Sequence, residues 1–564
     1  MGLTGRLAGL YPLEVDPGPE FRRAVRFLGV GPRPSEMLAA GYVLSGLVTL
    51  ALAGVSLLFP AGLRPAGLLA ALACGLAGSA AAGWLPRLFA TARRTRNLGA
   101  APDLVARAAL RMHVTPAPER AAAFAAETGE SGLAASLERH VRAAGPTGDA
   151  GLESFAGEWE EWFPSLGRAL ALVEAAGSVP PDRRGDVLDR ALDAVLEGVR
   201  TRTQEYARRI TGPATALYAF GVLLPTALVA LLPAARTAGL AVTPLSVAVV
   251  YDLAVPLVVV AAGAWLLAHR PVAFPPPRVT PAHPAVENAI SRRTALLFGG
   301  GAAVLGWLTA ARVAPGWGPP LVAVGWGVGG PLWLYFRPVR GVHERIRAAE
   351  RELPDALALL GRRVAAGESI ERAVEAASED VGGPVGETLA DGARRQRRLQ
   401  VGVEGAFLGQ RGVLGHLPSQ RLRASFSMVA LAGREGRPAG RALLSLSEHV
   451  GQLQRVEADA RAELDSVCNT LRSTGTTFGP LVAGATVALA AGMTGGGFIG
   501  GSGMPWLGGV VGVYVILLAA LLPALAVGLE RGFDPSLVGH AVGRALCVAV
   551  AVYLASYAFV GGLA

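Results

Sequence analysis

Residues 508–529 read GGVVGVYVILLAALLPALAVGL, a run that contains no charged side chain. A helix needs about 20 predominantly apolar residues to cross the hydrocarbon core of a membrane, and this run is long enough. Hydrophobic residues make up 52% of the 564-residue chain and charged residues only 17%. Because soluble domains carry about 25% charged residues, the composition and the run together predict a polytopic integral membrane protein.

Other apolar stretches qualify as membrane spans by the same criterion, although the sixth and seventh are short or rich in glycine. The nine predicted spans are 37–59, 67–84, 211–232, 245–267, 293–313, 318–336, 478–493, 508–529 and 538–560. Arginines collect in the N-terminal tail and in two large polar segments, whereas the loops on the opposite side are nearly uncharged. The positive-inside rule therefore places the N-terminus and both polar segments in the cytoplasm, and the C-terminus outside.

These spans divide the chain into eight predicted parts. They are a cytoplasmic N-terminal tail (1–36), spans one and two (37–86), a first cytoplasmic domain (87–210), spans three and four (211–268), a Pro- and Arg-rich cytoplasmic linker (269–292), spans five and six (293–336), a second cytoplasmic domain (337–475), and spans seven to nine (476–564).

The residue inventory excludes several chemistries. The chain has no lysine, so all 52 basic residues are arginines. A P-loop requires the lysine of its GK[ST] motif, so this nucleotide site is absent. No HExxH or GxSxG motif occurs, and the three cysteines lack the spacing of a metal site. We therefore predict no catalytic residue, no cofactor and no bound metal, and a protein that is not an enzyme.

The two polar segments are predicted to be all-α and to be copies of one another. In the second segment, Leu353, Ala356, Leu357, Leu360 and Val364 recur at the spacing of an amphipathic helix. A constant offset of 252 residues aligns the two segments over more than fifty positions. The aligned residues are Pro102-Asp103 with Pro354-Asp355, Glu119-Arg120-Ala121 with Glu371-Arg372-Ala373, Glu127 with Glu379, Leu137 with Leu389, and Phe155 with Phe407. Each copy is followed by apolar spans, so the sequence indicates a tandem duplication of a helical domain with its membrane helices.

The second copy resembles the F-domain of type II secretion and type IV pilus platform proteins. The resemblance covers residues 352–389, ELPDALALLGRRVAAGESIERAVEAASEDVGGPVGETL, and rests on Leu353, Pro354, Asp355, Gly367 and Glu371. The first copy retains the matching Pro102, Asp103 and Glu119. It has Val114 and Thr115 where the family has its turn glycine, so it is a degenerate copy. Two such domains among about nine spans look like the archaeal branch of the family, which serves adhesive pili or the archaellum.

The resemblance implies a function without chemistry of its own. Members of this family lie in the cytoplasmic membrane, dock a secretion ATPase on their cytoplasmic domains, and relay its motion to pilin-like subunits. The family also suggests a homodimer. Six arginines of the second copy could contact an acidic ATPase surface: Arg362, Arg363, Arg394, Arg395, Arg397 and Arg398. The run of arginines within 394–398 could instead contact lipid headgroups or form a solvated helix face. No aromatic interleaving accompanies it, so we predict no nucleic-acid partner.

A secondary transporter or channel built on an internal repeat is the alternative function. Asp252 lies near the outer end of the fourth span, and intramembrane carboxylates often mark ion pathways. Its position near the interface also permits an ordinary hydrated carboxylate. The clearest repeat lies in the polar segments rather than in the spans, and this favours the platform interpretation.

Overall fold

The computed structural model of the chain describes residues 3–29, 31–58, 64–129, 131–145, 150–240, 242–270, 279–286, 289–314, 316–435, 438–495 and 504–563. These residues form helices and connecting turns, with no strand among them. The predicted all-α fold class is confirmed for this part of the chain. Part of the predicted linker (271–278) and the segment between the seventh and eighth predicted spans (496–503) lie outside the described residues.

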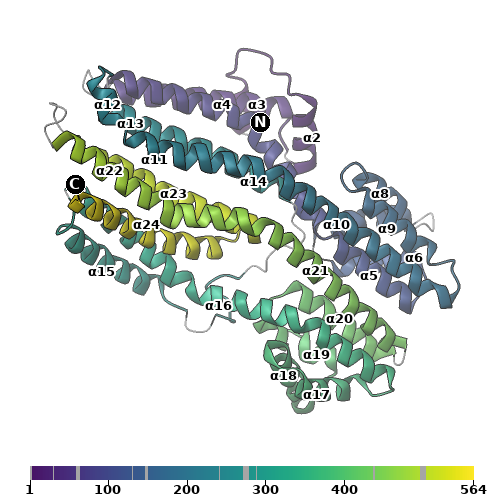
Figure 1. Cartoon of the computed structure of the whole chain (residues 1–564). Coiled ribbons are helices and arrows are strands. Elements are labelled where there is room, and N and C mark those ends of the chain that lie inside the picture. Colours follow the sequence, from purple (N-terminus) through teal and green to yellow (C-terminus); the bar gives the residue numbers. More distant parts are fainter. Residues whose placement is uncertain are drawn as a thin grey trace.

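The molecule is elongated, with long apolar helices side by side at one end and shorter helices gathered at the other (Figure 1). Six helical segments of the described chain are long and apolar enough to cross a membrane, which indicates a membrane protein. They are Pro34–Leu57, Pro181–Val229, Pro244–His269, Gly440–Met493, Leu507–Arg531 and Pro535–Gly562.

The other three predicted spans form helices that are not among these six. They correspond to α4 (Arg64–Leu98), α15 (Arg292–Ala310) and α16 (Gly318–Ala365). Their sequences include stretches such as GGGAA in α15 and GPP at the start of α16, whose small or ring-closed side chains contribute little apolar character. Among the described residues, length and composition therefore support six spans, and the count of nine remains a prediction.

Two series of helices follow one another along the chain. The first series consists of α3 (Pro34–Leu57), α4, α5 (Ala101–Val114), α6 (Pro118–Thr128), α7 (Gly132–Ala144), α8 (Leu152–Trp159), α9 (Pro164–Ala175), α10 (Pro181–Tyr218), η2 (Ala219–Leu223), α11 (Leu224–Val229), α12 (Leu232–Thr237), α13 (Pro244–Ala248), η3 (Val249–Ala254) and α14 (Val255–His269). The second series consists of α15, α16, α17 (Ile370–Asp380), α18 (Gly383–Leu399), α19 (Val403–Phe407), η4 (Val413–His416), α20 (Gln420–Glu435), α21 (Pro438–Ser473), η5 (Thr474–Phe478), α22 (Gly479–Gly495) and α23 (Leu507–Arg531). One more helix, α24 (Pro535–Leu563), follows the second series.

Each of the two polar segments forms a helical bundle, and large apolar side chains that align at the 252-residue offset are buried in both bundles. Leu137 and Leu389 are both completely buried, as are Phe155 and Phe407. The first bundle has its own hydrophobic core, built from residues between Leu98 and Val199. The core of the second bundle is built mainly from residues between Ala349 and Val450. The two bundles contact each other where α10 packs against α21.

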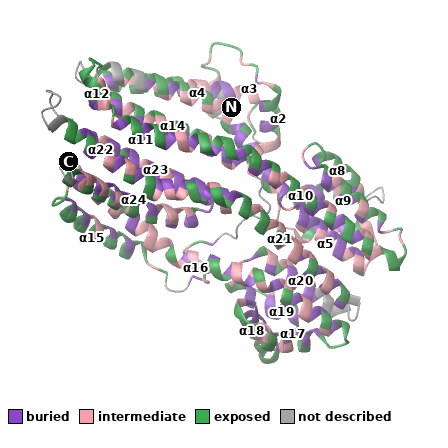
Figure 2. Ribbon diagram, viewed as in Figure 1, coloured by how far each residue is buried: buried purple, intermediate pink, exposed green. Residues whose placement is uncertain are grey.

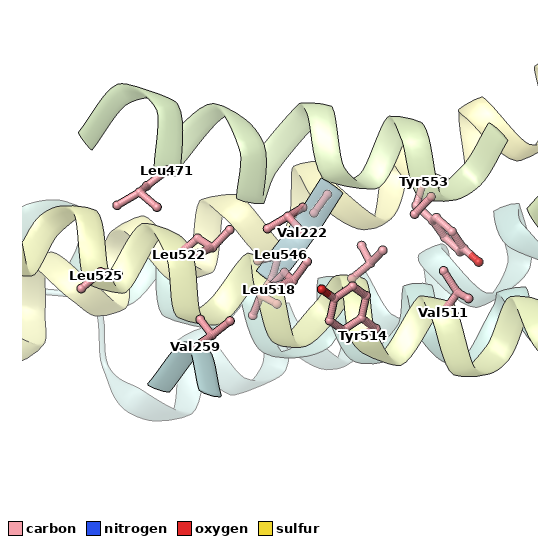
Figure 3. Packing of buried hydrophobic residues seen from close by; sticks show 14 of the residues in the cluster. Val222, Val259, Leu471, Val511, Tyr514, Leu518, Leu522, Leu525, Leu546 and Tyr553 are labelled. Carbon is pink, nitrogen blue, oxygen red and sulfur yellow. The ribbon is translucent and has the colours of Figure 1, made fainter. Parts of the chain in front are cut away.

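A third core lies among the apolar helices and joins both series (Figure 3). Figure 3 shows Tyr514 and Leu518 of α23 beside Val222 of η2. Pro225 lacks an N–H, so the carbonyl of Gly221, four residues earlier, receives no bond from the usual helical donor. The Tyr514 hydroxyl donates to that carbonyl. A break in one apolar helix is thus satisfied by a side chain from another.

Many large apolar side chains of these helices are exposed, as the green segments of α15 and α22 illustrate (Figure 2). On α15, Leu296, Leu297 and Leu308 have more than half of their surface uncovered. Soluble monomers rarely expose contiguous apolar patches of this kind. The exposed leucines therefore suit a hydrocarbon environment for α15 as well, although it is not among the six most apolar segments.

The predicted N-terminal tail contains two helices, α1 (Leu3–Ala8) and α2 (Pro19–Leu28). The side chain of Phe21 is fully buried and packs with Val25 and Leu38 in a small cluster. The described part of this segment is therefore packed against α3 and α4 rather than extended away from them.

Candidate functional site

The first three motif residues of the second bundle lie in the last third of α16 and have contrasting environments. Leu353 is buried in the bundle core, whereas Asp355 is exposed. Pro354 is inside the helix and cannot donate to the carbonyl of Glu350, four residues earlier. The side-chain amide of Gln454 donates to that carbonyl, and the Ser447 hydroxyl donates to the carbonyl of Pro354 at 2.8 Å. The proline therefore fixes the pairing of α16 with α21.

Gly367 ends α16 in a conformation that other residues rarely adopt. Its φ is 100°, in the region that favours glycine. Its N–H donates to the carbonyl of Val364 at 3.0 Å, and the N–H of Glu368 donates to the carbonyl of Arg363 at 3.1 Å. These two bonds form a Schellman cap. The side chain of Glu371 is exposed in the first turn of α17, so it is free to contact a partner.

The first bundle reproduces this motif incompletely. Pro102 starts α5, and Asp103 forms an ion pair of 2.8 Å with the buried Arg107. Thr115 stands where the second copy has Gly367, and its φ of −132° is extended. No Schellman cap can form with this backbone, which agrees with the degenerate character inferred from the sequence. Glu119 is exposed in the first turn of α6, as Glu371 is in α17.

Half of the arginines predicted to contact an ATPase are engaged by acidic residues of the same bundle. Arg363 pairs with Asp380 at 2.8 Å and with Glu368 at 3.6 Å. Arg394 pairs with Asp391, and Arg397 pairs with Glu375 of α17. The pairs of Arg363 with Asp380 and of Arg397 with Glu375 join neighbouring helices, whereas the pair of Arg394 lies within α18. All of them reduce the charge that an acidic partner would meet.

The remaining three arginines of that set are Arg362, Arg395 and Arg398. None of them has an ion pair within the part of the chain that is described. Arg362 and Arg398 are exposed, and Arg395 is half-buried. The candidate docking surface is therefore smaller than the sequence suggested and consists of these three side chains.

A second candidate site lies where the apolar helices meet the bundles, and we call it the junction cavity. Its volume is about 580 Å³, and its lining comes from both helix series. The lining includes Arg270 after α14, Arg347 of α16, Arg461 of α21, and Glu530 and Arg531 at the end of α23. Residues far apart in the sequence thus form one polar cavity at the inner ends of the apolar helices.

Glu530 is the acceptor that joins three of these segments. Its carboxylate accepts a hydrogen bond from Arg472 of α21 and one from Arg531 at 3.0 Å. Its backbone carbonyl accepts the Nη2 of Arg270 at 3.0 Å. Charge-assisted bonds of this kind are about twice as strong as neutral ones. The bundle helix α21 is therefore attached to the end of α23.

His343 lies at the same level and is almost completely buried. Its Nε2 is 3.7 Å from Oδ2 of Asp534. The other oxygen of this carboxylate, Oδ1, accepts the N–H of Ser536 at 2.8 Å and so caps α24. Burial lowers the pKa of His343 below its ordinary value, although the Asp534 carboxylate acts in the opposite direction. The neutral imidazole is therefore the stable form in the folded protein.

The junction cavity could not be predicted from the sequence. Arg270 simply follows the fourth predicted span. Glu530 and Arg531 simply follow the eighth span. Nothing in their local sequence indicates that the three meet, because their positions depend on how distant helices pack. The only available signal was that each charge directly follows a long apolar run.

No protein-family model, no curated protein and no solved structure matches this chain. Assignment of a function therefore rests on the residues and their geometry alone.

Proposed function

We propose that the chain is a cytoplasmic-membrane platform protein of an archaeal type IV pilus-like assembly or secretion machine. In this proposal nine helices cross the membrane, because α4, α15 and α16 join the six most apolar segments. The N-terminus and both bundles face the cytoplasm, and the C-terminus lies outside. The distribution of arginine and the exposed leucines of α15 support this topology.

The observation that carries the proposal is the continuity of α16 between the apolar layer and the second bundle. This helix has 48 residues, which corresponds to a length of about 70 Å at 1.5 Å per residue. A continuous helix moves as one body, whereas a flexible linker would absorb displacement. A force applied to the second bundle would therefore reach the membrane helices with little loss.

The docked partner would be a secretion ATPase, since the chain has no nucleotide motif of its own. The exposed side chains at the far end of α16 and on α18 offer the contact surface, with Arg362, Arg395 and Arg398 as its free charges. Movement of the ATPase would shift α16 and the paired α21. That shift would act on membrane helices that contact lipid and pilin-like subunits, in a chain that functions as a homodimer.

The experiment is a pull-down of the full chain in detergent with the secretion-type ATPase encoded beside its gene. The test variant carries Arg362→Glu, Arg395→Glu and Arg398→Glu. The matched control carries Arg120→Glu, Arg183→Glu and Arg190→Glu, which change three exposed arginines of the first bundle. We expect the wild type and the control to capture the ATPase and the test variant to lose it.

Two outcomes would contradict this expectation. Capture by all three proteins would reject the proposed surface but retain the platform function. Failure of the folded wild type to bind would reject the platform function itself.

An ion-conducting or transport function remains the second candidate because of Asp252. This residue lies in η3, within the candidate span Pro244–His269, and one of its carboxylate oxygens is buried without a hydrogen-bond partner. Proton or sodium flux into liposomes containing the purified chain would test it. Flux that disappears with Asp252→Asn would favour the transporter, and absence of flux would favour the platform.

A further inference from the structure

The walls of the junction cavity carry more positive than negative charge. Among the described residues, eight arginines and four carboxylates line it. Several of the arginines have carboxylate partners within the cavity. Arg421 pairs with Glu457 at 3.2 Å, Arg461 pairs with the same carboxylate, and Arg531 pairs with Glu530.

Three lining arginines have no carboxylate partner among the described residues: the exposed Arg423, and Arg270 and Arg347, which are both partly buried. Arg270 donates only from Nη2, to the backbone carbonyl of Glu530. Its Nε and Nη1 are buried and have no hydrogen-bond partner. A guanidinium stays charged in proteins, so two donors of a buried cation are unused.

The surroundings make both charges costly. Burial, together with the nearby Arg531 and Arg461, lowers the pKa of Arg347 to about 10. Burial also lowers the pKa of Arg270, and Arg461 acts on it in the same direction. Arg461 is therefore close enough to influence both. A buried cation without a partner is strongly destabilising, and an anion placed among these groups would remove that cost.

The chemistry of the donors narrows the kind of anion. A guanidinium presents a planar fork that matches the paired oxygens of a phosphate. The cavity also has an apolar wall that includes Leu196, Ile346 and Leu464. A phosphate attached to an organic group can use both kinds of surface. The position at the inner ends of the apolar helices is the level at which lipid headgroups would lie.

We propose that the junction cavity binds a phosphate-bearing anion, whose phosphate occupies the unused donors of Arg270 together with the guanidinium of Arg347. The bound phosphate would connect the end of α14 with α16, and so connect the first helix series with the second. This inference does not depend on the platform function, since it concerns ligand binding by the chain alone.

The experiment measures thermal unfolding of the full chain with increasing concentrations of ligand, because a ligand that binds only the folded state raises the midpoint. In detergent the probes are inorganic phosphate and pyrophosphate, with sodium chloride at equal ionic strength as a control for screening. In a second arm the chain is placed in nanodiscs of phosphatidylglycerol or of phosphatidylcholine. The test variant is Arg270→Gln with Arg347→Gln. The control variant is Arg208→Gln with Arg293→Gln, two exposed arginines outside the cavity.

We expect the wild type and the control to be stabilised, and the test variant to bind at least about tenfold more weakly, as expected for loss of a charge-assisted hydrogen bond. Stabilisation by phosphate or pyrophosphate would identify a soluble phosphate compound as the ligand. Stabilisation only in phosphatidylglycerol nanodiscs would identify a lipid headgroup.

Equal stabilisation of the test and control variants, or no stabilisation of the wild type by any probe, would overturn the proposal. If the double variant does not fold, Arg270→Lys serves in its place. It keeps the charge but lacks the fork, so we expect weaker binding with the fold retained.

Discussion

The hydrogen bond from Gln454 to the carbonyl of Glu350 provides a sharp test of how the second bundle is held together. Pro354 removes the N–H that would otherwise satisfy this carbonyl. In Gln454→Ala the carbonyl loses its described partner. Leaving a partly buried acceptor unsatisfied costs about 1–3 kcal/mol. Local opening of α16 should therefore become about 5- to 150-fold more frequent.

The same reasoning predicts that the effect disappears when the proline is absent. Pro354→Ala restores a backbone N–H that can bond to Glu350 within the helix. In that background Gln454→Ala should cost less than about 0.5 kcal/mol, so the double-mutant cycle should give a coupling of about 0.5–3 kcal/mol. Pro354→Ala alone should not destabilise α16, since proline is the poorest helix former.

Hydrogen exchange followed by mass spectrometry measures both effects, because it reports the opening free energy of individual segments. The peptides to follow are those covering 346–364. Gln452→Ala is the matched control, because Gln452 lies on the same helix and its side-chain oxygen has no hydrogen-bond partner. An equal cost of Gln454→Ala with and without Pro354 would refute the reasoning. A cost for Gln452→Ala as large as that for Gln454→Ala would also refute it.

Three further predictions concern the cap, the histidine and the junction. Gly367→Ala should cost about 1–2 kcal/mol of bundle stability, because the φ of Gly367 is positive. Thr115→Gly should show no comparable φ-related gain or loss, because Thr115 is extended, and thermal unfolding compares the two variants. Burial lowers the pKa of His343, so the stability that its neutral form contributes is full above the ordinary pKa of histidine and declines as the pH falls below that value. His343→Gln should flatten this decline between pH 7 and 5 in thermal unfolding. An unchanged pH profile would contradict the assignment. Glu530→Gln removes the charge that Arg472 contacts and should lower the free energy of unfolding in urea by about 1–3 kcal/mol. A decrease of less than about 0.5 kcal/mol would show that this ion pair contributes little to stability.

The features that sequence alone predicts are those governed by local pattern. Uncharged runs such as 508–529 predict apolar helices because their length and composition determine the outcome. The 252-residue offset identified pairs such as Phe155 and Phe407, and both side chains are buried. Thr115 in place of a turn glycine marked the first copy as degenerate, and its extended backbone excludes the Schellman cap that Gly367 forms in the second copy.

The features that sequence did not predict depend on contacts between distant segments. The cationic surface of the second bundle is reduced because Arg397 meets Glu375 of a neighbouring helix, and helical spacing along α18 cannot indicate that pair. Arg270 and Glu530 meet only because α14 and α23 end at the same level. Long flexible side chains can reach several partners, so charge counts along a chain overestimate the charge that remains free.

Continuity of the main helices differs between the two series, and this difference bears on how force would travel. In the first series α4 ends at Leu98 and α5 begins at Ala101, so the path that enters the bundle is interrupted, whereas the helical segment Pro181–Val229 runs unbroken from the bundle to the apolar layer. In the second series the equivalent path is the single helix α16, which contains Pro354 and keeps its alignment through bonds from α21. An interrupted helix can bend at the break, whereas α16 must move as a unit with α21. The platform proposal therefore assigns transmission of force to the second series, and the first series, joined to it through α10 and the junction cavity, serves as the support against which α16 and α21 move.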